Sequence, residues 1–122
     1  MSRILVLDPR ARGEGCPALL TAPAHEVVSC HDREALVSAF SVRRPSVLVY
    51  VLQELVRDVE LLSAIRTAAP RLPIIVLGEP ATLETRRLIQ DLKPTYYGVF
   101  PLERMELADA VSAVLDAGAP AA

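Results

Sequence analysis

Short apolar runs alternate along the chain with longer stretches in which apolar residues recur every three or four positions. Five runs rich in Val, Ile, Leu and Tyr cover residues 3–8, 26–30, 46–52, 73–78 and 96–100. Several of them are apolar at nearly every position, which is typical of parallel strands covered on both faces. We therefore expect a mostly parallel sheet enclosed by helices.

The stretches with helical spacing cover residues 32–44, 56–69, 82–92 and 102–117. Asp32 and Thr82 stand at positions suited to N-caps, and Pro45 ends the first of these helices. The residues expected on the buried faces are Leu36, Val37, Phe40, Val59, Leu62, Ile65, Leu88, Ile89, Leu92, Leu107, Val111, Val114 and Leu115. Strands alternating with helices of this length predict an α/β fold.

Residues 9–25 form a different kind of connection, because glycines at 13 and 15 and prolines at 17 and 23 interrupt it. These residues leave room for only a short or distorted first helix over 17–22. With right-handed crossovers, the whole pattern predicts a three-layer, doubly wound sandwich. At 122 residues the chain fits one domain, which we place at 1–117. Residues 118–122 then begin an Ala/Pro linker or disordered tail, and we expect a further domain in the natural protein.

Charge and hydropathy exclude several classes of function. The net charge of −2 gives no field that attracts nucleic acid or anionic lipid, so we expect no direct nucleic-acid binding and no membrane association. No apolar run approaches the roughly 18 residues of a membrane span, and the charged start lacks the cleavage region of a signal peptide. We expect a cytoplasmic domain in which Cys16 and Cys30 are reduced thiols.

The carboxyl ends of the predicted strands are where a doubly wound sheet places its ligand site. Here those ends carry Asp8, Val51, Leu52, Gly78, Glu79, Phe100 and Pro101. The central strand, "SVLVYVL", therefore ends without a carboxylate.

Four stretches resemble the receiver domain of bacterial response regulators over nearly the whole chain. They are "RILVLD", "RRPSVLVYVL", "RLPIIVLGE" and "YYGVFPLERMELADAVSAVL". The resemblance implies the strand order 2-1-3-4-5. It also places the family's magnesium-binding acidic pair on Asp8 and Pro9, its phosphoacceptor on Val51, its phosphate-contacting hydroxyl on Gly78 and its lysine on Phe100. Of these five positions only Asp8 keeps the family's chemistry.

Each departure has a physical consequence. Val51 has no lone pair with which to attack phosphorus, so no acyl phosphate forms there. Asp8 beside Pro9 is a poor magnesium site, because the ion needs several oxygen ligands. Phe100 places an apolar ring where phosphoryl transfer needs a cation. We expect a degenerate receiver that acts without phosphorylation, has no cofactor or metal, and is not an enzyme, since no nucleophile and base are paired.

Four alternatives stay open. The remodelled strand ends could bind a small apolar metabolite instead. Glu54 and Glu79 are either solvated loop carboxylates or extra ligands that complete a metal site with Asp8. Asp58 or Asp8 could accept phosphate in place of Val51. Tyr97 stands where the family places an aromatic switch, and it is otherwise a half-buried packing residue.

Because the pocket lacks the family's phosphorylation residues, we expect the function to depend on a surface of the domain. By the resemblance, that surface is formed by helix 82–92, strand 96–100 and helix 102–117. Its candidate contact residues are Arg86, Arg87, Gln90, Tyr97, Val99, Glu103, Arg104 and Glu106. A basic helix beside an acidic one is self-complementary across a twofold axis, which favours a homodimer, although solvated faces would look the same. We interpret the chain as a signalling and protein-interaction module, the N-terminal regulatory part of a larger bacterial regulator, with transcription among its outputs.

Overall fold

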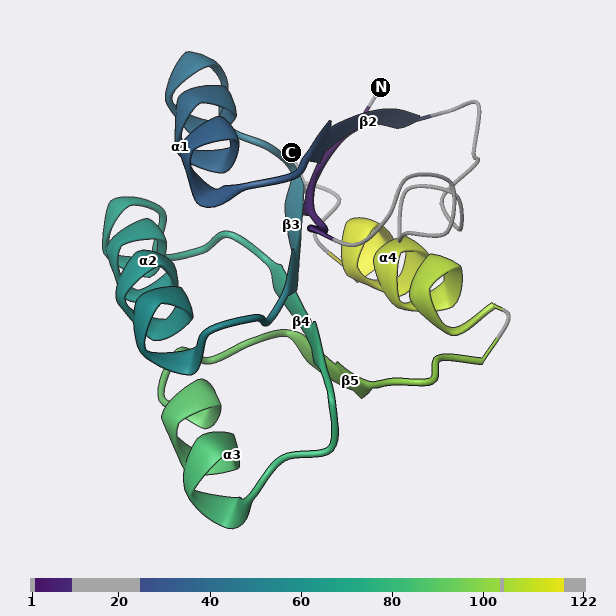
Figure 1. Cartoon of the computed structure of the whole chain (residues 1–122). Coiled ribbons are helices and arrows are strands. Elements are labelled where there is room, and N and C mark those ends of the chain that lie inside the picture. The colour runs from purple at the N-terminus through teal and green to yellow at the C-terminus, as the bar shows by residue number, and fades with distance from the viewer. Residues whose placement is uncertain (1, 10–24, 104, 118–122) are drawn as a thin grey trace.

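The computed structural model describes residues 2–9, 25–103 and 105–117 (Figure 1). Its elements are β1 (Ser2–Leu7), β2 (His25–Cys30), α1 (Arg33–Val42), β3 (Val47–Val51), α2 (Leu55–Ala68), β4 (Ile74–Gly78), α3 (Leu83–Gln90), β5 (Tyr96–Val99) and α4 (Glu106–Ala117). The short helix expected over 17–22 and the linker at 118–122 lie outside the described residues. No helix in these ranges has the length and apolarity needed to cross a membrane.

The five strands form one parallel sheet in the order β2-β1-β3-β4-β5. Both the predicted fold class and the predicted strand order are therefore confirmed. All residues of β3 and β4 are buried, as expected for central strands covered on both faces.

Helices cover the two faces of the sheet unequally (Figure 1). On one face α1, α2 and α3 pack against a core that contains Leu48 and Tyr50 of β3. On the other face α4 packs on Val49 and Val51. Because side chains alternate along a strand, neighbouring residues of β3 belong to different cores.

The helix starts were predicted correctly where a side chain caps them. The carboxylate of Asp32 accepts a hydrogen bond of 2.7 Å from Ala35 N, and Thr82 Oγ1 accepts one of 3.3 Å from Thr85 N. The start expected at 102 for the last helix is wrong, because α4 begins at Glu106. There the Glu106 side chain accepts a bond of 3.1 Å from Glu103 N, so a turn precedes the helix.

Two residues predicted to be buried are exposed. Val37 is 45% exposed and Leu88 is 44% exposed, whereas their neighbours Leu36 and Ile89 are fully buried. Successive residues of an α-helix are about 100° apart around its axis, because a turn takes 3.6 residues. Each helix therefore turns one member of the pair to the sheet and the other to solvent.

Candidate functional site at the carboxyl ends of the strands

The sheet brings the candidate residues at the carboxyl ends of the strands together. Leu7 pairs with Tyr50, so the next residues, Asp8 and Val51, lie side by side on adjacent strands. On the other side of Val51, Phe100 N donates a hydrogen bond of 2.9 Å to Gly78 O. All of these positions therefore lie together at the carboxyl ends of the strands.

Val51 gives the centre of this end of the sheet an aliphatic surface. It is the last residue of β3, only 4% of it is exposed, and it belongs to the core beneath α4. The half-buried ring of Phe100 packs against the same core. Neither side chain has a nucleophilic atom or a charge to offer a phosphoryl group.

Asp8 is a buried carboxylate at the same end, with 2% of the residue exposed. Its backbone N donates a bond of 3.0 Å to Cys30 O, and His31 Nδ1 lies 3.4 Å from its carbonyl oxygen. Magnesium usually keeps one or two carboxylates among about six oxygen ligands. With Pro9 and Val51 as the neighbours of Asp8, the donor set at this end does not fit the magnesium site that the resemblance implies.

At Gly78 a hydroxyl-bearing side chain would require Leu52 to move by a few tenths of an ångström. A Cβ atom at this position would lie 3.2 Å from Leu52 Cδ1, which is tighter than ordinary van der Waals contact. Leu52 itself is held by a bond of 2.8 Å from its N to Leu77 O. An apolar side chain therefore fills the place next to β4 where the family's hydroxyl is expected.

The cavity at this end is small in the described part of the chain. It holds about 70 Å³ between the ends of β1 and β3 and the start of α1. Pockets for small organic ligands hold roughly 300–1,000 Å³. This volume suits a few waters and not a metabolite.

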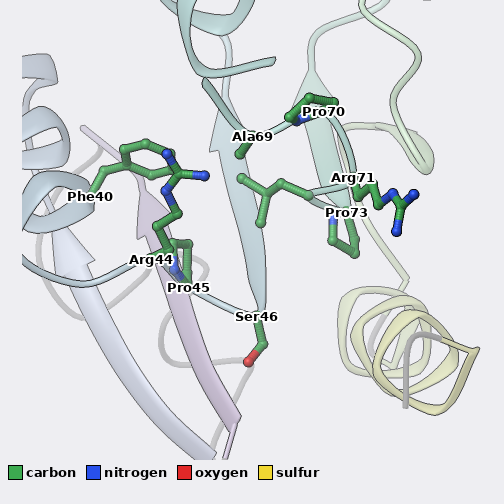
Figure 2. Close-up of a pocket in the computed structure, with 9 residues that line it drawn as sticks. Phe40, Arg44, Pro45, Ser46, Ala69, Pro70, Arg71 and Pro73 are labelled. Atoms are coloured by element: carbon green, nitrogen blue, oxygen red, sulfur yellow. The ribbon is translucent and has the colours of Figure 1, made fainter. Parts of the chain in front are cut away.

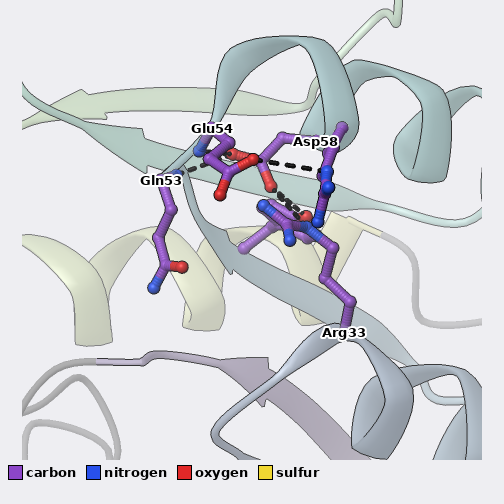
Figure 3. A network of polar contacts seen from close by, with 6 residues as sticks. Arg33, Gln53, Glu54 and Asp58 are labelled. Atoms are coloured by element: carbon purple, nitrogen blue, oxygen red, sulfur yellow. Dashed lines mark hydrogen bonds and ion pairs between the residues drawn. The ribbon is translucent and has the colours of Figure 1, made fainter.

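A buried polar network beside this cavity was not predicted from the sequence. The carboxylate of Asp58, on a residue that is 1% exposed, accepts hydrogen bonds from Tyr50 OH at 2.5 Å, Gln53 N at 2.6 Å and Glu54 N at 2.9 Å. Arg33 Nε lies 3.2 Å from Asp58 Oδ1 and completes the network (Figure 3). Both oxygens of Asp58 are occupied, so this carboxylate is not free to accept phosphate.

The network sets the protonation of its members. Burial raises the pKa of Tyr50, and the hydrogen bond to Asp58 raises it further, so the phenol stays a donor. Burial alone would lower the pKa of Arg33, but hydrogen bonds to Tyr50 and Asp58 raise it above its ordinary value. A tyrosine within the aliphatic run "VLVYV" was the sequence signal, because a buried phenol needs a partner.

The rim carboxylates Glu54 and Glu79 are both exposed, as loop carboxylates usually are. Glu54 also forms an exposed ion pair with Arg57, at 3.4 Å.

The predicted interaction face is divided between exposed and half-buried side chains. Arg86, Arg87 and Gln90 of α3 and Glu103 are exposed, and Arg104 lies outside the described residues. Tyr97 and Val99 of β5 are half-buried.

Two tyrosines of β5 point to opposite faces of the sheet. Tyr97 packs against the core under α1 to α3, and its buried hydroxyl has no hydrogen-bond partner within the described ranges. Tyr96 packs on the α4 side, where its hydroxyl donates a bond of 2.5 Å to Glu106. That bond lowers the pKa of Glu106 and occupies its carboxylate within the chain.

Comparison with known proteins identifies the fold of this chain through solved structures alone. No family model matches the sequence, and no curated protein matches it. Among solved structures, a CheY-like receiver domain from Methanospirillum hungatei JF-1 superposes with a TM-score of 0.84 at 18% identity, covering 98% of this chain and 97% of that one. CheY4 of Vibrio cholerae gives a TM-score of 0.81 at 19% identity, over 94% and 99%.

NtrX from Brucella abortus, solved in complex with ADP, gives a TM-score of 0.79 at 19% identity. The match covers 97% of this chain and 27% of the NtrX chain. At such low identities the similarity shows that this chain has the receiver-domain fold.

Proposed function

We propose that this chain is a signal-transduction module of the response-regulator type that works without phosphorylation at its strand ends. The observation that carries the proposal is the buried Val51 at the end of β3, in the position that the family's phosphoacceptor would occupy. A valine cannot form an acyl phosphate, so a signal must reach this domain by another route.

The surroundings of Val51 support the same conclusion. Phe100 supplies no cation, the space beside Gly78 is filled by Leu52, and Asp8 stands beside a proline. The cavity of about 70 Å³ at the carboxyl ends of the strands gives no support to metabolite binding there, which was the alternative from the sequence.

We infer that the domain regulates a larger protein. NtrX, whose chain is matched over 27% of its length, is an example of a receiver fold within a longer polypeptide. In this proposal the chain is the N-terminal regulatory domain of a bacterial regulator and acts on its attached or associated partner by contact.

The contact surface in this proposal is formed by α3, β5 and the segment leading into α4. Arg86 and Arg87 are exposed on α3, and Glu103 is exposed before α4. Across a twofold axis these opposite charges would face each other, so a homodimer is the partner that we propose. Glu106 contributes less than expected, because Tyr96 already holds its carboxylate.

Incubation with acetyl phosphate and magnesium, followed by intact-mass measurement, tests the absence of phosphorylation. We expect no mass increase, while a receiver domain that retains its acidic residues gains one phosphate under the same conditions. A stable gain of one phosphate by this chain would overturn the proposal, and Asp8→Asn and Asp58→Asn variants would then locate the acceptor.

Analytical ultracentrifugation tests the dimer. Arg86→Glu combined with Arg87→Glu should shift the sedimentation profile toward the monomer. Arg43→Glu combined with Arg44→Glu makes the same change in charge at the end of α1 and should leave the profile unchanged. A monomeric wild type at concentrations near 0.1 mM would remove the dimer and leave the surface for a different protein partner.

A further inference from the structure

A larger cavity lies at the opposite end of the strands, at the amino ends of β3 and β4 (Figure 2). It holds about 410 Å³ between the carboxyl end of α1 and the loop that follows α2. Phe40, Ala69, Leu72 and three prolines give it an apolar lining. The volume falls within the range of roughly 300–1,000 Å³ that is typical of small-ligand sites.

The charged groups at this cavity are positive. Arg44 and Arg71 line it, and none of its lining residues in the described part of the chain is acidic. The Arg44 guanidinium lies over the ring of Phe40, 5.6 Å from the centroid. The Arg71 side chain, on the opposite wall, points away from Arg44 (Figure 2). Among the described residues neither arginine forms an ion pair. The stacking holds Arg44 in place, and its charge is available to a ligand.

The wall formed by the loop after α2 is fixed by internal hydrogen bonds. Arg66 donates from Nη1 to Leu72 O at 2.6 Å, to Pro70 O at 3.3 Å and to Ala69 O at 3.5 Å. The next carbonyl, that of Pro73, accepts a bond of 3.0 Å from Leu48 N. These carbonyls are therefore occupied, and this wall offers a ligand apolar surface and few hydrogen-bond acceptors.

Ser46 lies at the rim of the cavity, and its hydroxyl points away from Arg44 and Ala69 (Figure 2). Its N donates a bond of 2.8 Å to Arg3 O, and its Oγ lies 3.4 Å from Arg3 N, which donates to it. These bonds join the start of β3 to β1 and leave Arg44 as the charged group that a ligand can meet.

We propose that this cavity binds a small organic anion with an aromatic or branched aliphatic body. The acidic group, a carboxylate or sulfonate, pairs with the guanidinium of Arg44, which is held over the ring of Phe40. The apolar body lies against Leu72 and the prolines. The proposal does not depend on whether the carboxyl ends of the strands are phosphorylated, because the two sites lie at opposite ends of the strands.

A pair of fluorescent probes tests the charge requirement. The anion 8-anilino-1-naphthalenesulfonate and the neutral N-phenyl-1-naphthylamine share nearly the same aromatic body. We expect the folded wild type to bind the anion in a saturable way and at least about tenfold more tightly than the neutral probe. Equal affinity for the two probes, or no saturable binding of the anion, would overturn the proposal.

Variants locate the binding. Arg44→Gln should weaken binding of the anion about tenfold without changing the neutral probe, since one charge-assisted contact is lost. Arg43→Gln removes the same charge from the adjacent exposed residue, which does not line the cavity, and should change nothing. Amide shifts in ¹H–¹⁵N spectra should centre on Ser46, Ala69 and Leu72. Equal binding by Arg44→Gln and wild type, or shifts centred elsewhere, would refute the site.

Discussion

The phenol of Tyr50, near the end of β3, donates a hydrogen bond of 2.5 Å to the carboxylate of Asp58 in the first turn of α2. The same carboxylate accepts from the backbone N of Gln53 and Glu54, so it also fixes the loop between the strand and the helix. A negative charge near a helix N-terminus is favourable in itself. This acidic group therefore supports the fold beside the strand ends.

Asp58→Ala should be strongly destabilising, because it leaves the buried phenol, two backbone N–H groups and Arg33 without their acceptor. We expect a loss of about 3–5 kcal/mol in the free energy of unfolding, measured by urea denaturation. Asp58→Asn keeps one acceptor oxygen and should lose less. A loss below about 1 kcal/mol for Asp58→Ala would show that the network contributes little.

Tyr50→Phe removes one donor from the same network and leaves the others in place. We expect a loss of about 1 kcal/mol, because Asp58 keeps its bonds from two backbone amides and Arg33. Chemical denaturation of both single variants and the double variant measures the coupling between Tyr50 and Asp58. Additive losses would mean that the hydrogen bond is not a stabilising contact.

Val51→Asp should destabilise the chain at neutral pH, because the new carboxylate would be buried next to Asp8. Burial and a neighbouring acid both raise the pKa of such a group in the folded state above its unfolded value. The penalty is then present above the folded pKa and disappears below the unfolded one. We expect a loss of about 3 kcal/mol at pH 7 and a clearly smaller one at pH 4.

Val51→Asn is the control for that measurement, since it adds a polar group of similar size without a charge. Its loss of stability should be the same at pH 7 and pH 4 in denaturation curves. If the stability loss of Val51→Asp also did not depend on pH, position 51 would be more accessible to water than its burial indicates.

Gly98→Ala should be destabilising, because the added Cβ would lie 2.6 Å from Leu77 Cδ2 and 3.2 Å from Tyr96 Cε2. Leu77 is fully buried in the middle of the core and has little room to move. We expect a loss of about 1–3 kcal/mol, seen as a lower Tm in a calorimetric scan. Gly78→Ala, where half-buried Leu52 can yield, should lose less.

Tyr96→Phe should make stability less dependent on pH in the acidic range. The phenol lowers the pKa of Glu106 in the folded state. The hydrogen bond therefore adds to the stability of the folded chain above the unfolded pKa of glutamate. That contribution is lost as the pH falls through the folded pKa. The Tm difference between wild type and Tyr96→Phe should therefore shrink between about pH 6 and pH 3. A constant difference would mean that Glu106 is not stabilised by the phenol.

The sequence by itself determined the layers, because continuous apolar runs and helical spacing are local patterns. The strand order was predicted from the resemblance to the receiver family, not from these patterns. The sequence also determined the capped helix starts at Asp32 and Thr82, since a cap acts within one turn. It shows that the chain has Val51 and Phe100 at the ends of two strands. The assignment of those residues to the family's phosphorylation positions stays a prediction.

Only the tertiary structure decided which polar groups meet and where space is left. Arg33, Tyr50 and Asp58 come from α1, β3 and α2, and no spacing in the sequence indicates that they share a carboxylate. The cavity at the amino ends of β3 and β4 likewise joins Phe40 and Leu72, which are far apart along the chain. Such contacts depend on how helices pack across the sheet, which is a property of distant residues and not of local periodicity.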